Sequence, residues 1–90
     1  TFSDAVSPSH YKGFFLDYEW IEVKQVTNPN IDAALQLQVE KYLDRCGKKD
    51  HELQELLKAR WYLDFWIARK VNGDRFTRVA DIERLISNVT

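Results

Sequence analysis

Four basic side chains stand close together in the middle of the chain, within residues 41–49. Lys41 and Arg45 are four residues apart, so on a helix they lie on one side. Lys48 and Lys49 follow, and Asp44 is the one acidic residue in this basic segment. Cationic side chains gathered in this way can hold phosphate oxygens. The spacing therefore suggests a site for a phosphate-sized anion.

A second helix would supply more of this site. Residues 51–70 have helical periodicity, and the start of a helix favours an anion through its free N–H groups and its dipole. Glu55 and Lys58 lie three residues apart near this start, and Tyr62, a candidate for stacking on a base, falls on the same face. A short turn makes the two helices antiparallel neighbours. These side chains could therefore converge with the basic segment on one phosphate-sized volume.

The same residues also have a purely structural interpretation. Cations in the last turn of a helix stabilise it by about 0.3–1 kcal/mol each through its dipole. Lysines in a turn are ordinary solvated surface, and spacing alone favours this interpretation. Gly47-Lys48 is no phosphate-binding loop, because the rest of the glycine-rich pattern and its Ser/Thr are missing.

Acidic pairs suggest a different chemistry, the binding of Mg²⁺ by carboxylates on facing helices. Three pairs stand at helical spacing: Glu19 with Glu22, Glu52 with Glu55, and Glu40 with Asp44. Basic residues nearby favour solvated or ion-paired carboxylates instead, so we expect no metal site. Cys46 has cationic neighbours that could lower its pKa, but its place on an apolar stripe favours burial.

The elements that must position these residues are helical. Residues 1–18 predict an irregular lead-in, and apolar residues at three- and four-residue steps predict helices at 31–46, 51–70 and 77–88. Residues 17–26 also fit a strand, but their spacing favours a short helix. The sequence predicts a single all-α domain over residues 1–90, a small helical bundle built on an antiparallel helix hairpin.

Local signals set the predicted helix ends. Asn28 precedes Pro29, which ends the first helix by residue 27, and Asn30 is suited to cap the next one. Gly47 suits a left-handed helix end, and Asp50 can cap the third helix. The apolar residues of the third helix cover more than one face, which predicts packing on two sides.

Composition excludes several function classes. Thirteen basic and 14 acidic residues give a net charge of −1, which argues against a general nucleic-acid-binding protein. No apolar run approaches the ~20 residues that span a bilayer, and no signal peptide is visible. The single cysteine excludes an internal disulfide. Composition therefore predicts a small cytosolic domain.

Taken together, several segments resemble, in order and spacing, a small phage domain family that includes the nucleotide kinase of coliphage podoviruses, which lacks a phosphate-loop motif. The resemblance covers roughly residues 7–68 and departs from the family at Gln38, Glu55 and Leu57. The segments are Pro8-Ser9-His10-Tyr11, Ile21-Glu22-Val23, Lys41-Tyr42, Arg45, Gly47-Lys48-Lys49, Lys58-Ala59 and Trp61-Tyr62-Leu63.

The resemblance implies phosphoryl transfer from a nucleoside triphosphate to a deoxynucleoside monophosphate in the cytoplasm of an infected host. Lysines and Arg45 would hold phosphates, Glu22 or Glu55 would orient a cation or the acceptor hydroxyl, and His10 with Tyr11 would close over the ligand. The catalytic residues expected on this basis are Arg45, Lys41, Lys58 and Glu22, and the nucleotide-binding residues are His10, Tyr11, Lys48, Lys49, Glu55 and Tyr62.

A chain of 90 residues can hardly enclose two nucleotides, so we expect a homo-oligomer with a shared site. The aromatic residues of the third helix would supply the contact surface. Two alternatives stay open. One is a hydrolase similar to the all-α nucleotide pyrophosphohydrolases, which hold Mg²⁺ on four acidic side chains. The other is a non-catalytic module that binds a nucleotide or a host protein.

Overall fold

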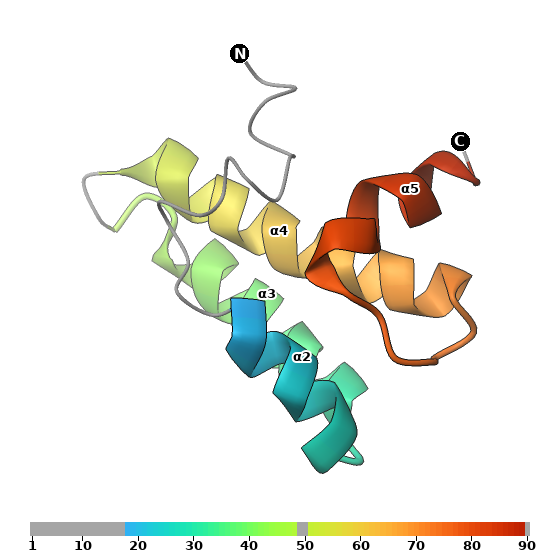
Figure 1. Cartoon of the computed structure of the whole chain (residues 1–90). Helices are drawn as coiled ribbons and strands as arrows, with labels where there is room; N and C mark the ends of the chain where they lie inside the picture. Colours follow the sequence, from blue (N-terminus) through green and yellow to red (C-terminus); the bar gives the residue numbers. More distant parts are fainter. Residues whose placement is uncertain (1–17, 49–50, 90) are drawn as a thin grey trace.

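The computed structural model describes residues 18–48 and 51–89, and this part of the chain is helical with no strand (Figure 1). The predicted all-α fold is confirmed. The helix bounds agree with the prediction to within two residues for the first three helices, which are the ones that carry the candidate site. The elements in order are α2 (Tyr18–Thr27), α3 (Ile31–Arg45), α4 (Glu52–Val71), the 3₁₀ turn η2 (Val79–Asp81) and α5 (Ile82–Ser87).

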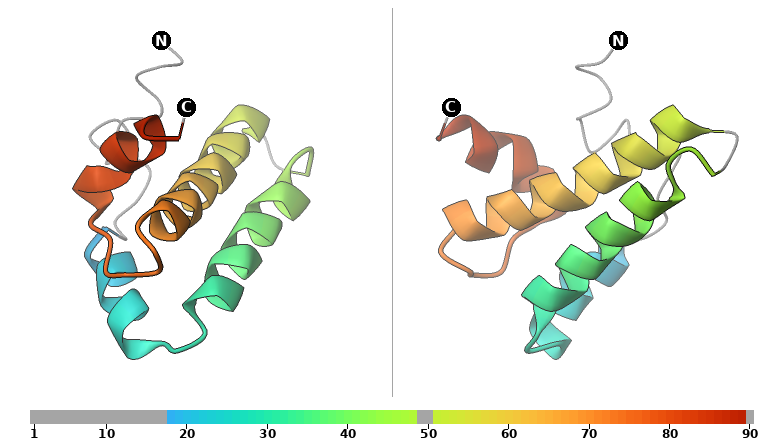
Figure 2. Two further views of the ribbon diagram at one scale, coloured as in Figure 1. Left: turned by 90° about the vertical axis from the view of Figure 1, so that its right-hand side faces the viewer. Right: turned by 180° about the vertical axis from the view of Figure 1, so that it is seen from behind.

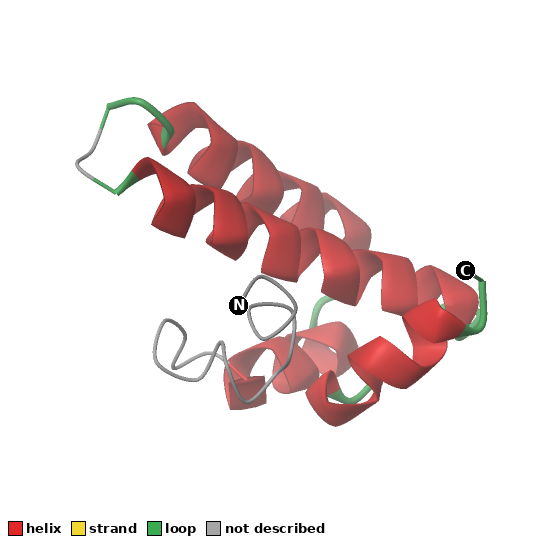
Figure 3. Ribbon diagram, turned by 90° about the horizontal axis from the view of Figure 1, so that it is seen from above, coloured by secondary structure: helices red, strands yellow, loops and turns green. Residues whose placement is uncertain are grey.

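The predicted antiparallel helix hairpin is formed by α3 and α4. These two helices make the most extensive contact between elements of the described chain. The views in Figure 2 show them side by side, with α2 and α5 both on one side of the pair, and Figure 3 shows the same arrangement from above. The other side of the hairpin is not covered by any described element. The molecule therefore has one layer made by the hairpin and a second, partial layer made by α2 and α5.

The core lies between these layers and is rich in aromatic rings. Trp61 stacks on Phe65 with ring centroids 6.1 Å apart and meets Tyr62 edge-to-face at 4.9 Å. Ile21 from α2 and Leu35 from α3 are buried with them. Burying each of these side chains contributes about 1.5–3 kcal/mol. The aromatic residues of α4 thus serve the core of the chain, and the prediction that they supply an oligomer contact is wrong.

The apolar residues of α4 that face outward are leucine and isoleucine. The predicted packing of this helix on two sides is confirmed, because α4 contacts both α3 and α5. Four of its apolar side chains are nevertheless exposed, namely Leu53, Leu56, Leu63 and Ile67. Two charged residues of α4, Glu55 and Arg69, are buried. Their burial is possible because both have polar partners within the bundle.

Helix ends follow the predicted chemistry in part. Gly47 has φ 78°, the left-handed conformation expected at the end of α3. Asn30 precedes α3 but makes no side-chain cap bond. Instead, Oδ1 of Asn28 accepts a hydrogen bond of 2.9 Å from the backbone N–H of Asn30, closing a turn around Pro29. Asp50 and the lead-in lie outside the described residues. The last predicted helix is shorter than residues 77–88, because residues 79–81 form a 3₁₀ turn.

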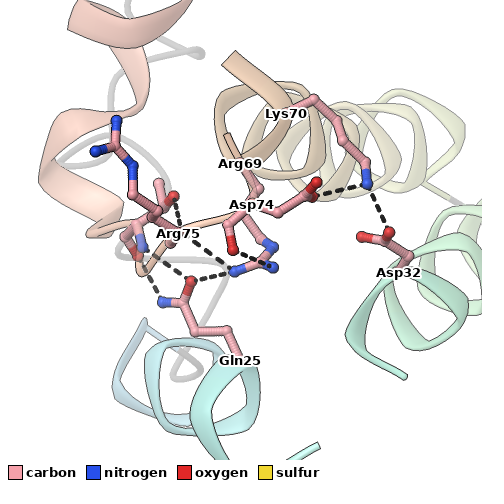
Figure 4. A network of polar contacts seen from close by, with 7 residues as sticks. Gln25, Asp32, Arg69, Lys70, Asp74 and Arg75 are labelled. Carbon is pink, nitrogen blue, oxygen red and sulfur yellow. Dashed lines mark hydrogen bonds and ion pairs between the residues drawn. The ribbon is translucent and has the colours of Figure 1, made fainter. Parts of the chain in front are cut away.

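A buried arginine joins α2 to the end of α4 and the loop after it (Figure 4). One terminal nitrogen of Arg69 donates to Oε1 of Gln25 at 2.7 Å, and the other donates to the carbonyl oxygen of Asp74 at 3.3 Å. Gln25 in turn accepts from the backbone N–H of Thr77 at 2.9 Å and donates to its carbonyl oxygen at 2.6 Å. This network fixes α2 and the C-terminal segment on the same end of α4.

A second polar contact joins the two hairpin helices. The Nζ of Lys70 lies 2.6 Å from Oδ2 of Asp32 on α3 and 2.8 Å from Oδ1 of Asp74 (Figure 4). The two carboxylates raise the pKa of Lys70, and Lys70 lowers the pKa of Asp74. All three side chains are about half exposed, so the contact fixes the register of the hairpin more than it stabilises the fold.

Candidate functional site

Three cationic side chains surround one aromatic ring at the end of the hairpin. The Nζ of Lys41 lies 5.1 Å from the ring centroid of Tyr42, the guanidinium carbon of Arg45 5.8 Å, and the Nζ of Lys58 5.5 Å. Lys41 and Arg45 come from the last turns of α3, and Lys58 comes from α4. We call these three side chains the cationic cluster. The negative face of an aromatic ring attracts each cation, and this attraction gathers them in one place.

One buried carboxylate lies among these cations. Oε1 of Glu55 is 3.6 Å from the guanidinium of Arg45 and 4.0 Å from the Nζ of Lys58, and Glu55 as a residue is 4% exposed. Its second oxygen, Oε2, is buried and has no hydrogen-bond partner among the described residues. Three cations against one carboxylate leave an excess of two positive charges, which favours a dianionic ligand such as a phosphate monoester.

A pocket of about 220 Å³ opens beside the cluster. It is lined by Trp20 from α2, by Gln38, Lys41 and Tyr42 from α3, and by Tyr62 from α4. Oε1 of Gln38 is buried without a hydrogen-bond partner among the described residues, and Trp20 is 39% exposed. The pocket thus offers an aromatic surface, an amide acceptor and a cation within one concave volume.

Tyr42 and Tyr62 form the floor between the pocket and the core. Their rings are stacked with centroids 5.8 Å apart and an interplanar angle of 14°. Tyr62 is only 1% exposed, because its ring stacks on Tyr42 and makes a T-shaped contact with Trp61. Tyr62 therefore forms part of the pocket wall from the core side and is not an open platform for a base.

The structure brings half of the sequence-predicted site residues together. Lys41, Arg45, Lys58 and Glu55 form the charged cluster, and Tyr62 lies at the pocket beside it. This convergence follows from the α3–α4 turn, which places the end of one helix beside the start of the other. Lys48 is exposed in that turn. His10, Tyr11 and Lys49 lie outside the described residues.

Glu22, which was expected among the catalytic residues, is not part of this group. Its Oε2 accepts a hydrogen bond of 2.9 Å from the backbone N–H of Val79, at the start of η2. It also lines a different, mostly apolar groove with Val23, Val26, Thr27 and Phe76. Glu22 instead holds the C-terminal segment against α2, a contact between residues far apart in the sequence that spacing cannot reveal.

Sequence reasoning missed three pocket residues, Trp20, Gln38 and Tyr42. Tyr42 belongs to the buried core and stands three residues before Arg45. A cation three residues from an aromatic residue is its neighbour on the surface of a helix, where a cation–π contact can form. Gln38 lies one turn before Tyr42 on the same face, so the same spacing signal points to it.

For Cys46 the sequence offers two opposing effects, cationic neighbours that could lower the pKa of its thiol and a place on the apolar stripe that favours burial. Desolvation raises the pKa of the Cys46 thiol, and the nearby carboxylates of Glu52 and Glu55 raise this pKa further. The cationic neighbours do not lower this pKa, and Arg45 pairs with Glu55 instead. The Sγ of Cys46 lies 3.4 Å from the carbonyl oxygen of Tyr42 and donates to it.

A raised pKa predicts slow alkylation of Cys46. The pH–rate profile with iodoacetamide should have its midpoint above that of an ordinary thiol, because the thiolate forms only at higher pH. Glu52→Gln should move this midpoint down, since one repulsive carboxylate is removed. Glu40→Gln, at another exposed glutamate, should leave it unchanged. A midpoint at or below the ordinary thiol value would show that the basic segment controls this thiol after all.

No group of three or more His, Cys, Asp or Glu side chains that could hold a metal ion occurs among residues 18–48 and 51–89. One carboxylate of each acidic pair has another partner, since Glu22 accepts from the backbone of Val79, Glu55 pairs with Arg45 and Glu40 accepts from Gln36. Of the described helices, none is both long and apolar enough to span a membrane.

Comparison with protein families gives one match. The family model of DUF3310, described as a protein of unknown function, matches residues 6–64. The matched segment contains the cationic cluster, Glu55 and the pocket residues, and it ends before Arg69 and the C-terminal helices. Comparisons with curated proteins and with solved structures found no match. Because the matched segment is more than half of the chain, the protein belongs to the DUF3310 family.

Proposed function

We propose that the protein binds a deoxynucleoside monophosphate at the cationic cluster and transfers a phosphoryl group to it from a nucleoside triphosphate. The observation that carries this proposal is the gathering of Lys41, Arg45 and Lys58 around Tyr42, offset by the single carboxylate of Glu55. The resemblance to the phage family that includes a nucleotide kinase favours the same reaction.

The charge balance supports a phosphate ligand. Three cations within 6 Å of one ring centroid repel one another, and Glu55 compensates only one of them. A phosphate monoester would supply the missing negative charge. Arg45 offers the planar fork that matches phosphate oxygens, and the two lysines act as point charges.

The neighbouring pocket supports a base or sugar as the rest of the ligand. Trp20 presents a partly exposed ring on which a base can stack, and Gln38 offers both donors and acceptors to its edge. At about 220 Å³ the pocket is smaller than the roughly 300–1,000 Å³ of most ligand sites. It therefore fits part of one nucleotide, and the second nucleotide needs further surface, which an oligomer would provide.

Phosphoryl transfer needs positioning of the two nucleotides and stabilisation of charge more than it needs a covalent catalyst. An oxygen of the acceptor phosphate bonds to the γ-phosphorus of the donor while the bond from that phosphorus to the bridging β-oxygen breaks. The products are a deoxynucleoside diphosphate and a nucleoside diphosphate. The cationic cluster would stabilise the charge that develops on the phosphoryl oxygens, and Glu55 would hold Arg45 and Lys58 in position.

The hydrolase alternative has less support. Its Mg²⁺ site needs several carboxylates in one place, and the described residues contain no such group. In addition, the buried carboxylate of Glu55 beside the cationic cluster already pairs with two cations, Arg45 and Lys58. The non-catalytic alternative uses the same cluster and differs only in the absence of turnover.

Incubation of the chain with labelled nucleoside triphosphate and each deoxynucleoside monophosphate in turn tests the proposal, with the products separated by charge. We expect label in one or more deoxynucleoside diphosphates. Binding of a monophosphate without any transfer would contradict the kinase reaction and leave a binding module. Loss of label to free phosphate without an acceptor would indicate a hydrolase.

A further inference from the structure

The loop that follows α4 begins with the pair Asn72-Gly73. Asn72 is the one asparagine of the chain that a glycine follows. The other asparagines, Asn28, Asn30 and Asn88, precede a proline or a β-branched residue. An asparagine side chain loses ammonia when the backbone nitrogen of the next residue attacks it, and glycine hinders this attack least because it has no Cβ. The sequence therefore places the most reactive asparagine at the end of α4.

The reaction at this pair is deamidation. The backbone nitrogen of Gly73 bonds to Cγ of Asn72 while the bond from Cγ to Nδ2 breaks. The proton of the Gly73 nitrogen leaves with the amide nitrogen as ammonia, and a cyclic succinimide remains. Water then adds to either ring carbonyl carbon and opens the ring to aspartate or isoaspartate. The result is a carboxylate in place of a neutral amide.

The fold needs both residues of this pair. Gly73 has φ 71°, in the left-handed region that favours glycine. Nδ2 of Asn72 donates to the carbonyl oxygen of Phe76 at 3.0 Å and lies 3.2 Å from Oγ1 of Thr77, its second acceptor. Thr77 is 1% exposed. The loop thus uses a side-chain amide and a glycine at the two positions that together are reactive.

The native hydrogen bonds hold the reacting groups away from each other. The backbone N–H of Gly73 donates to the carbonyl oxygen of Lys70 at 3.1 Å. On the other side of the same peptide group, the carbonyl oxygen of Asn72 accepts from Nε of Arg75 at 2.8 Å. Ring closure requires the Gly73 nitrogen to turn toward Cγ of Asn72. Several of these bonds must therefore break before the reaction can start.

We propose that Asn72 is a deamidation site that the native loop protects, and that its conversion weakens the hold of the loop on the C-terminal segment. A carboxylate at position 72 cannot donate to the carbonyl oxygen of Phe76. Its charge would also lie at the C-terminal end of α4, where the helix dipole disfavours an anion. The inference is independent of the proposed kinase activity, because Asn72 lies at the opposite end of α4 from Glu55 and Lys58.

Incubation of the intact chain at mildly alkaline pH, in native buffer and in guanidinium chloride, tests the site. Mass spectrometry of the tryptic peptide 71–75, with chromatographic separation of isoaspartate, measures the conversion. In denaturant we expect Asn72 to react before the other asparagines. In native buffer its conversion should be at least about tenfold slower, because several hydrogen bonds must break first. Equal rates in the two buffers would overturn the protection, and faster conversion of Asn28, Asn30 or Asn88 in denaturant would overturn the site.

The variant Asn72→Asp tests the consequence of the reaction. Its urea midpoint should be lower than that of the wild type, since the donor to Phe76 is lost. Asn28→Asp is the matched control, because Oδ1 of Asn28 accepts from the backbone N–H of Asn30 at 2.9 Å and an aspartate keeps this acceptor. Its midpoint should stay at the wild-type value. Equal midpoints for the two variants would show that conversion of Asn72 does not weaken the fold.

Discussion

Arg45→Ala should reduce phosphoryl transfer by about 10²–10³-fold, the usual cost of removing one group that stabilises transition-state charge. Arg45 supplies the only guanidinium among the three cations around Tyr42. The loss should appear in kcat more than in KM, because Lys41 and Lys58 still attract the ground-state phosphate. Label transfer under saturating substrates measures this effect.

The variant should remain folded, so that activity alone is measured. The Arg45 side chain is 40% exposed, and the buried carboxylate of Glu55, 3.6 Å from it, has a second cationic partner in Lys58 at 4.0 Å. Because this second partner is retained in the variant, the helix content measured by circular dichroism should be unchanged. Arg84→Ala is the matched control, because Arg84 on α5 also pairs with a carboxylate, that of Asp81, at 3.6 Å. Equal activity in the two variants would mean that the reaction site lies elsewhere.

Arg69→Ala should lower the free energy of unfolding by about 3 kcal/mol, the largest stability effect that we expect from a single polar residue here. Hydrogen bonds from a charged donor contribute about 1.5–3 kcal/mol each, and their loss leaves buried acceptors unpaired. Arg69 is 5% exposed and joins Gln25 on α2 to the loop after α4. Urea denaturation followed by circular dichroism measures the change.

Arg75→Ala is the control for that experiment. Arg75 is exposed, and its side chain donates to the carbonyl oxygen of Asn72 at 2.8 Å, so its removal should change stability by no more than about 0.5 kcal/mol. The carbonyl oxygen of Arg75 that faces Arg69 belongs to the backbone and is retained. Equal stability of the two variants would show that the buried network does not hold α2 in place.

The helices could be predicted because their local signals agree. Pro29 and Gly47 mark the two ends of α3, and the apolar period runs through the segment between them. The charged cluster could also be predicted, because a short turn between two helices places Arg45 beside Glu55 whatever the rest of the fold does. Both predictions depend only on the spacing of residues within one helix hairpin.

What could not be predicted depends on contacts between distant parts of the chain. Glu22 binds the backbone of Val79, 57 residues away, so its helical spacing with Glu19 carried no information about its partner. In α4 the periodicity shows two apolar faces and does not say which one is buried. The aromatic face is buried because Trp61 and Phe65 fill the space under α2 and α5, while the leucine face stays exposed.

An NMR titration of the isotope-labelled chain with deoxynucleoside monophosphates tests the central claim most directly. If the cationic cluster holds the phosphate, amide shifts should change along residues 38–45 of α3 and 55–62 of α4, and Lys58→Ala should weaken this response. The amides of η2 and α5 should not respond. Shifts confined to η2 and α5, or no shifts with any nucleotide, would contradict a nucleotide site at Tyr42.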